Sequence, residues 1–184
     1  MAIGMTRIME TVNAVRKGLI ACLSGILCLF CSISNAESQM KFEELIQKLD
    51  AANPWTVERV EEVLGSKLIE TSSTKTFVIH KTGQLLFEEN LIIEEVHLRL
   101  RIAKNELIRL IVSLSDEASC FTLDRIKESY PDIQNDPYGL TPGDSPNATF
   151  GYWTQRPWGH INFAFKMRRP KCLSHIAFIP KGEE

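Results

Sequence analysis

The residues of this chain whose types could do chemistry are four histidines, a short acidic stretch and a group of aromatic side chains. The histidines are His80, His97, His160 and His175. They are far apart and lack both the i, i+4 spacing and the cysteine partners of a zinc site. His97 falls on the polar side of an expected strand, where we expect it to be exposed. The histidines therefore predict no metal site.

The acidic stretch loosely resembles a calcium loop, with Asp132, Asn135 and Asp136 ahead of Gly139. Pro137, however, occupies the place where such a loop needs its glycine turn. The sequence contains neither a G-x-S-x-G elbow nor a glycine-rich phosphate loop, and no pair of carboxylates stands out. We therefore expect no catalytic residue, no metal and no cofactor, and we predict that the chain is not an enzyme.

The aromatic group lies in and beside a stretch rich in Pro, Gly, Asn and Asp that runs from 132 to 148. Aromatic and arginine side chains on rigid turns are the usual anchors of protein interfaces, since they bury much area at small entropic cost. Trp158, at a turn tip beside Gly159, is expected to be the most exposed. The competing interpretation is that Tyr152 or Trp153 faces the core. The predicted partner-binding residues are Tyr138, Tyr152, Trp153, Arg156 and Trp158.

Hydrophobic periodicity predicts the elements that position these residues. Helices are expected over 41–52, 56–65 and 122–130, and strands over 76–80, 84–87, 91–102, 107–115, 149–155, 160–167 and 172–179. In two strands, alternate apolar residues face the core: Val96, Leu98, Leu100 and Ile102 in one, and Ile161, Phe163, Phe165 and Met167 in the other. A helix followed by an antiparallel meander, twice, predicts an α+β fold with the helices packed on one face of a shared sheet.

The order of elements reflects an internal repeat. The segment 56–63 aligns with 122–129, and 96–114 aligns without a gap with 161–179. Thr56 and Thr122 are expected to cap the two equivalent helices. We therefore predict a first repeat over 37–118 and a second over 119–184, in one domain.

The N-terminal segment predicts export. Arg16 and Lys17 precede an apolar run from 18 to 33, and Ser34-Asn35-Ala36 offers small residues for cleavage, as in a secretory signal peptide over 1–36. Alternatives are an uncleaved anchor or a lipid anchor at Cys22. We predict a periplasmic or secreted protein, cleaved near Ala36. After cleavage Cys120 and Cys172 remain, and in an oxidising compartment they are expected to form a disulfide, with free thiols as the alternative.

Charge narrows the class of partner. The whole chain has a formal net charge of −2, which disfavours nucleic acid as the partner of an exported protein. Bases crowd the last hairpin, which suits an acidic partner, peptidoglycan or, as a minor association, lipid headgroups. The alternative is a solvated edge strand whose charge resists sheet-to-sheet pairing.

The helix Thr56–Gly65 reads T-x-x-x-V-x-x-x-L-G, and Phe150-Gly151-Tyr152-Trp153 precedes a hairpin of alternating apolar positions. With these residues each half resembles the helix-plus-meander unit of the BamE and beta-lactamase inhibitor protein (BLIP) families. The resemblance implies binders and scaffolds. We therefore expect another protein as the partner, bound either by an inhibitor or immunity protein that occludes an enzyme or toxin, or by an envelope assembly scaffold of BamE type.

Overall fold

The structure is a computed structural model, and it describes residues 40–87, 90–117, 119–136 and 148–183. The predicted signal peptide lies outside these residues. The helices are α2 (Phe42–Ala51), α3 (Val57–Leu64) and α4 (Leu123–Ser129). The strands are β1 (Ile69–Ser73), β2 (Phe77–Lys81), β3 (Leu85–Leu86), β4 (Ile92–Arg101), β5 (Glu106–Leu114), β6 (Gln134–Asn135), β7 (Thr149–Arg156), β8 (Gly159–Lys166) and β9 (Leu173–Pro180).

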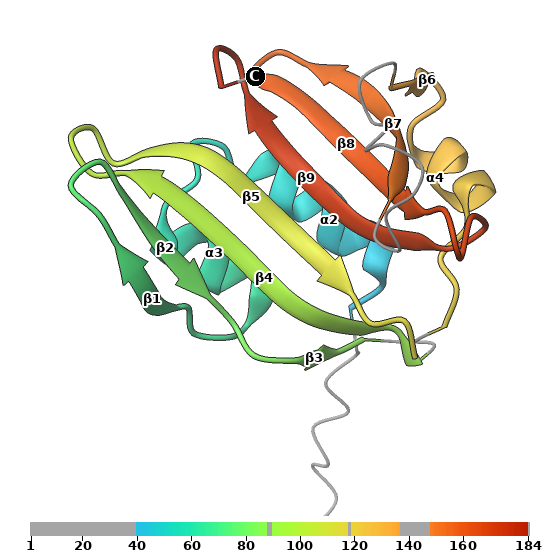
Figure 1. The fold of residues 1–184 in the computed structure, drawn as a ribbon, viewed down its shortest axis with the longest axis horizontal. Coiled ribbons are helices and arrows are strands. Elements are labelled where there is room, and N and C mark those ends of the chain that lie inside the picture. The colour runs from blue at the N-terminus through green and yellow to red at the C-terminus, as the bar shows by residue number, and fades with distance from the viewer. Residues whose placement is uncertain (1–39, 88–89, 118, 137–147, 184) are drawn as a thin grey trace, which may run out of the picture. The chain divides into compact units, whose positions relative to one another are not determined.

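All the strands belong to one antiparallel sheet, which confirms the α+β class. The order across the 9-stranded sheet is β1-β2-β4-β5-β9-β8-β7-β6, with β3 paired to β4 beyond the end of β2 (Figure 1). Strands β1 to β5 precede α4 in the chain, and β6 to β9 follow it. The two groups meet where β5 pairs with β9.

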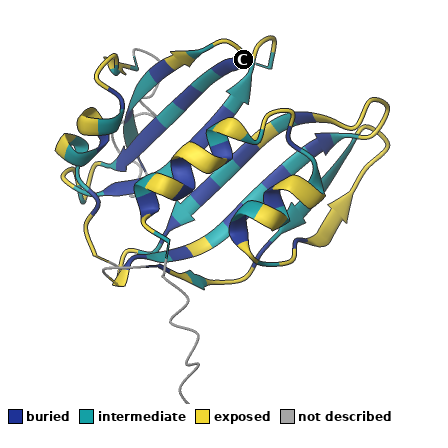
Figure 2. Ribbon diagram, turned by 180° about the vertical axis from the view of Figure 1, so that it is seen from behind, coloured by how far each residue is buried: buried dark blue, intermediate teal, exposed yellow. Residues whose placement is uncertain are grey.

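The helices α2 and α3 cross one face of this sheet (Figure 2). Helix α2 buries Phe42, Leu45, Ile46 and Leu49, spaced so that they form a single apolar stripe. At the end of α4, the ring of Tyr130 packs 5.3 Å from that of Phe163 on the same side of the sheet. The core therefore lies between the helices and one face, and the other face carries no helix among the described residues.

Periodicity located the long elements well, to within about two residues. The expected stripes are confirmed for the strand interiors, but Ile102 and Met167 are 47% and 51% exposed. Both lie just past a strand end, in a turn, where alternation no longer fixes the side of the sheet. Strands β1 and β6 were not predicted.

The expected disulfide between Cys120 and Cys172 is present, with the Cα atoms 4.9 Å apart. The hydroxyl of Thr56 caps α3 by accepting a hydrogen bond from the Arg59 backbone N–H at 3.3 Å. Thr122 occupies the cap position of α4, but its side chain makes no cap hydrogen bond, so that expectation was wrong. Its backbone pairs with that of Cys172 in an isolated antiparallel β-bridge.

The gap-free alignment of the two hairpins is also wrong. Leu98 pairs with Leu110 across β4 and β5, whereas its aligned residue Phe163 pairs with Ile176 across β8 and β9. The chain between the paired positions is one residue longer in the second hairpin. The alignment consequently matched half-buried Ile111 with buried Ile176, on opposite sides of the sheet.

Candidate functional site

Of the predicted partner-binding residues that the structure describes, only Arg156 and Trp158 are brought together, on Asp50. Tyr138 lies outside the described residues. Tyr152 pairs with Phe163 and faces the core side, where its ring packs 5.8 Å from that of Phe165. Trp153, the next residue of β7, pairs with Asn162 and faces the opposite, helix-free side.

Arg156 and Trp158 flank the β7–β8 turn, and both bind Asp50 at the end of α2. The Trp158 indole Nε1 donates to Asp50 Oδ1 at 2.9 Å, and Arg156 Nε donates to Asp50 Oδ2 at 3.1 Å. The Trp158 ring also meets that of Trp55, edge to face, at 4.5 Å. The expectation that Trp158 is exposed was therefore wrong, because the turn folds back onto α2 and leaves the ring half-buried.

Tyr130 completes this cluster from the end of α4. The Arg156 guanidinium lies 4.8 Å from the centre of the Tyr130 ring. Burial, followed by the negative charge of Asp50, raises the pKa of Tyr130 to about 12. We call Asp50, Tyr130, Arg156 and Trp158 the Asp50 cluster. It borders an open recess of ≈ 550 Å³, and its polar contacts join α2, α4 and the β7–β8 turn.

The second region of interest is the helix-free face of the sheet, which is turned toward the viewer in Figure 1. Its side chains are those that alternate with the buried stripes and pair with one another across the strands. They are Phe77, Ile79 and Lys81 of β2, Glu95, His97, Arg99 and Arg101 of β4, Glu106, Arg109, Ile111 and Ser113 of β5, His175, Ala177 and Ile179 of β9, His160, Asn162, Ala164 and Lys166 of β8, and Thr149, Gly151, Trp153 and Gln155 of β7. We call this set the open face.

Most cations at the edges of the open face are paired within the chain. Lys81 binds Glu95 at 2.8 Å, and Lys166 binds Asp116 at 2.9 Å. Arg101 forms an ion pair with Glu183. In each of these three ion pairs the positive charge is neutralised by a carboxylate. The positive charge of the open face that has no such partner among the described residues is therefore that of Arg99 and Arg109.

Two arginines stand directly opposite each other on this face, near the hairpin end of β4 and β5. Arg99 of β4 is the cross-strand partner of Arg109 of β5. Neither forms an ion pair with any residue that the structure describes. The Arg99 guanidinium is stacked on the Phe77 ring, 3.6 Å from its centre, and Arg99 Nε is buried without a hydrogen-bond acceptor among the described residues. Directly opposed like charges destabilise a sheet, so this arrangement is costly as it stands.

The pKa values of two histidines near the arginines are lowered, first by burial and then by the neighbouring positive charges. Burial lowers the pKa of His97, and the charges of Lys81, Arg99 and Arg109 lower it further, against the opposing effect of Glu95. Burial likewise lowers the pKa of His175, followed by Lys166 and Arg109. Both imidazoles are therefore held toward the neutral form. His97 is half-buried, so our expectation of an exposed side chain was wrong.

Small residues hollow the open face next to Arg109. Gly151, Ala164 and Ala177 lie on neighbouring strands, and the hollow they share has a volume of ≈ 220 Å³. Arg109, His175 and Asn162 are among its other lining residues. At its far side Asn162 Nδ2 donates to Asp136 Oδ2, so the acidic group there is already engaged.

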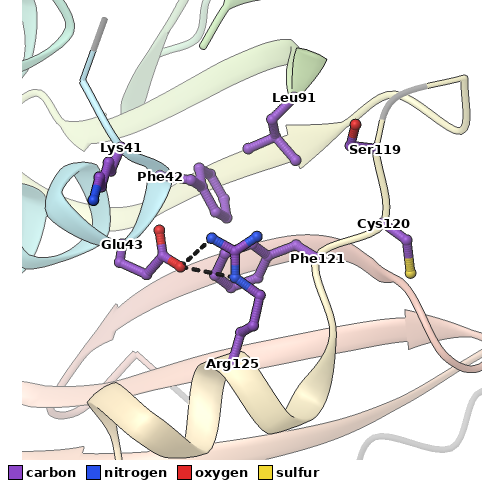
Figure 3. Close-up of a pocket in the computed structure, with 8 residues that line it drawn as sticks. All are labelled: Lys41, Phe42, Glu43, Leu91, Ser119, Cys120, Phe121 and Arg125. Atoms are coloured by element: carbon purple, nitrogen blue, oxygen red, sulfur yellow. Dashed lines mark hydrogen bonds and ion pairs between the residues drawn. The ribbon is translucent and has the colours of Figure 1, made fainter. Parts of the chain in front are cut away.

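A third recess, between α2 and α4, is too small for a ligand. Figure 3 shows Arg125 reaching Glu43 there, with Nε 2.9 Å from Glu43 Oε1 and a second bond from Nη2. Its volume is ≈ 20 Å³, room for about one water. Cys120 lines it too, bonded to Cys172. The recess is best understood as part of the contact that ties α4 to α2.

Two carboxylates of the acidic stretch that resembled a calcium loop accept hydrogen bonds from other side chains. Asp132 Oδ2 accepts from the Thr154 hydroxyl at 2.7 Å, and Asp136 binds Asn162. Gly139 lies outside the described residues. Within the described ranges no group of three or more His, Cys, Asp or Glu could hold a metal ion.

Comparisons with known proteins give no match: no protein family, characterised protein or solved structure resembles this chain closely enough to be counted. None of the helices in the described ranges has the length and apolar character needed to span a membrane.

Sequence reasoning missed the opposed arginines. Alternation placed Arg99 on the polar side of its strand, but the β4–β5 register was needed to bring Arg109 opposite to it. The short turn 102–105 could have predicted this register, because turn length determines which residues pair in a hairpin. A bulge between Arg99 and Leu100 shifts the pairing from that expectation by one residue.

Proposed function

We propose that this chain is an exported protein-binding module of inhibitor or immunity type, which occludes an enzyme or toxin with its open face. The observation that carries the proposal is a pair of opposed arginines, without an ion-pair partner among the described residues, on a sheet face that carries no helix in the part of the chain described. Two opposed positive charges destabilise the free protein, and a partner that brings a negative charge to them would offset that destabilisation.

Two further features support this role. The open face extends over strands from both halves of the chain, a surface broad enough for a protein partner. The contacts that hold the helices, namely the Asp50 cluster, the Glu43–Arg125 pair and the disulfide, do not use its central side chains. These contacts hold the sheet and helices together from the other side, and a preorganised face lowers the entropic cost of binding.

We further propose that the module consists of two repeats, 37–118 and 119–184. Each has a helix followed by four strands that proceed from an edge of the sheet to its centre: α3 with β1, β2, β4 and β5, and α4 with β6, β7, β8 and β9. The last strands of the two units pair antiparallel, as expected of copies related by an approximate two-fold axis. Helix α2 and strand β3 have no counterpart among the described residues of the second unit.

Affinity capture tests the function. The full chain, tagged at its C-terminus and purified from an oxidising compartment, is presented to envelope and secreted proteins of its host. We compare it with Ala177→Trp, which fills the hollow, and with Lys48→Trp, a matched control on the exposed side of α2. Trp158→Ala tests whether the Asp50 cluster takes part. Thermal melting establishes that each variant is folded.

Capture of one stoichiometric enzyme or toxin, lost only in Ala177→Trp, is the expected result. Loss in Trp158→Ala instead would move the binding surface to the recess beside Asp50. Recovery of assembly-machine components, insensitive to Ala177→Trp, would replace the inhibitor with the envelope scaffold of BamE type.

A further inference from the structure

We infer that Arg99 and Arg109 together hold a carboxylate from an acidic segment of the partner protein. The inference rests on the proposed function and adds the chemistry of the bound group. Arg99 and Arg109 are directly opposite each other on neighbouring strands, and like charges so placed repel each other and destabilise the free protein. A carboxylate between the two guanidiniums replaces that repulsion with attraction.

Arg99 is prepared for this role by its neighbours. Its guanidinium carbon lies over the Phe77 ring, 3.6 Å from the ring centre, a cation–π contact that helps to hold the side chain in place. Opposite it in β2 is Ile79, an apolar side chain that offers no hydrogen-bond acceptor. The buried Nε has no acceptor among the described residues either. Because Nε is buried, a carboxylate arriving from outside would meet the terminal Nη groups, and a side chain already held in place loses little freedom when it does so.

Arg109 supplies the second donor group from the adjacent strand. It is exposed, and it lines the hollow floored by Ala164 and Ala177. A partner chain that enters the hollow would thus approach Arg109 from the β9 side while its carboxylate reaches Arg99. One planar guanidinium matches a carboxylate with two parallel hydrogen bonds, and the remaining lone pairs of the carboxylate oxygens can accept from the second guanidinium; this geometry favours a carboxylate over a diffuse charge.

The surrounding charge favours a protein over a polyanion. Nucleic acid and polyphosphate bind through many unneutralised cations along a backbone. Here the flanking Lys81, Arg101 and Lys166 already have acidic partners, so only the pair of opposed arginines is available. The apolar neighbours Phe77, Ile79 and Ile111 suit the side chains that flank an acidic residue in a protein.

The test uses a fluorescein-labelled glutamate oligopeptide and, in parallel, inorganic polyphosphate, each titrated into the full chain and followed by anisotropy or competition. The test variant is Arg99→Gln/Arg109→Gln. The control is Lys48→Gln/Lys127→Gln, which removes the same charge from exposed helix positions. The test variant relieves a repulsion but also removes the contact between Arg99 and Phe77, so thermal melting establishes that each variant is folded before binding is compared. Arg109→Gln alone, at an exposed site, is the second variant.

We expect the test variant to bind the glutamate peptide about tenfold or more weakly, as the loss of charge-assisted hydrogen bonds implies, and the control to bind like the wild type. Equal affinity of the test variant and the wild type, or no measurable binding of the peptide, overturns the inference. Polyphosphate binding about tenfold tighter than the peptide, through the same arginines, also overturns it in favour of a polyanion.

The captured partner separates the two proposals. If Ala177→Trp abolishes capture and Arg99→Gln/Arg109→Gln does not, the open face binds the partner but the carboxylate inference is wrong. If neither variant affects capture, the proposed function itself fails.

Discussion

Removal of the Cys120–Cys172 bridge is expected to destabilise the protein substantially, since the bridge closes a long loop. The two cysteines are separated by 52 residues, and the bridge fixes the segment before α4 to the start of β9. In the chain-entropy description, a loop of this length lowers the entropy of the unfolded chain by about 14 cal/mol/K, or about 4 kcal/mol near 25 °C. We expect Cys120→Ala/Cys172→Ala to lose a free energy of unfolding close to that value.

Part of the local geometry should survive this change. Leu173 N–H donates to the Phe121 carbonyl at 2.8 Å, and Thr122 bridges Cys172, so the backbone holds β9 beside α4 without the sulfur bond. The variant is therefore expected to fold and to be less stable, not to change its structure.

Urea unfolding of the oxidised wild type, the reduced wild type and the double alanine variant measures the effect, with tryptophan emission as the signal. The reduced protein and the variant should agree, and reductant should leave the variant unchanged. A loss below about 1 kcal/mol in both would refute the entropic reasoning, because it would mean that the unfolded chain is not constrained by the bridge.

Other predictions concern the helix side and the last hairpin. Asp50→Ala removes the acceptor of the Trp158 indole, and we expect a loss of about 2 kcal/mol with a red shift of tryptophan emission; unchanged emission would contradict the contact. Tyr130→Phe tests alkaline stability: the folded pKa is about 12 against 10.0 unperturbed, so the wild type should lose up to about 3 kcal/mol more than the variant as pH rises through that window. Equal pH profiles would count against a buried phenol. Gly159→Ala should cost about 3 kcal/mol or more, since its Cβ would lie 2.0 Å from a β9 carbonyl oxygen, whereas Gly83→Ala, with open space around it, should change stability by less than about 1 kcal/mol; similar losses would disprove the close approach.

The part of the fold that sequence predicted is the part built on burial. Helix α2 and strands β4 and β8 each bury a regular stripe, and periodicity locates such elements directly. Strand β1 is exposed along its whole length and rich in Ser and Thr, so it has no alternation to detect. It exists because β2 offers it a hydrogen-bonding edge, which is a property of the assembled sheet.

The candidate site was harder to predict because its members are distant in sequence. The bond between Trp158 and Asp50 joins residues 108 positions apart, so a turn that looks exposed by its composition is partly covered by a helix from the other end of the domain. Tyr152 and Trp153 were both predicted to bind a partner, with the alternative that one of them faces the core; adjacent residues of a strand point to opposite faces, and Tyr152 is the one on the core side. Strand alternation alone is therefore enough to divide the predicted set between the two faces of the sheet.

The two faces of the sheet make different contacts, and under the proposed function the first half of the chain takes part in binding through the open face. The sequence predicted that aromatic residues of the second half bind the partner. In the structure Arg156 and Trp158 bind Asp50 of α2 and stabilise the packing of the helices on the sheet. The open face has its unneutralised charge on β4 and β5, from the first half, and its hollow on β7, β8 and β9, from the second. Ile111 and Ala177 pair across the junction between the halves. A partner seated at the centre must therefore contact both halves, and the antiparallel pairing of β5 with β9 sets the distance between its two points of attachment.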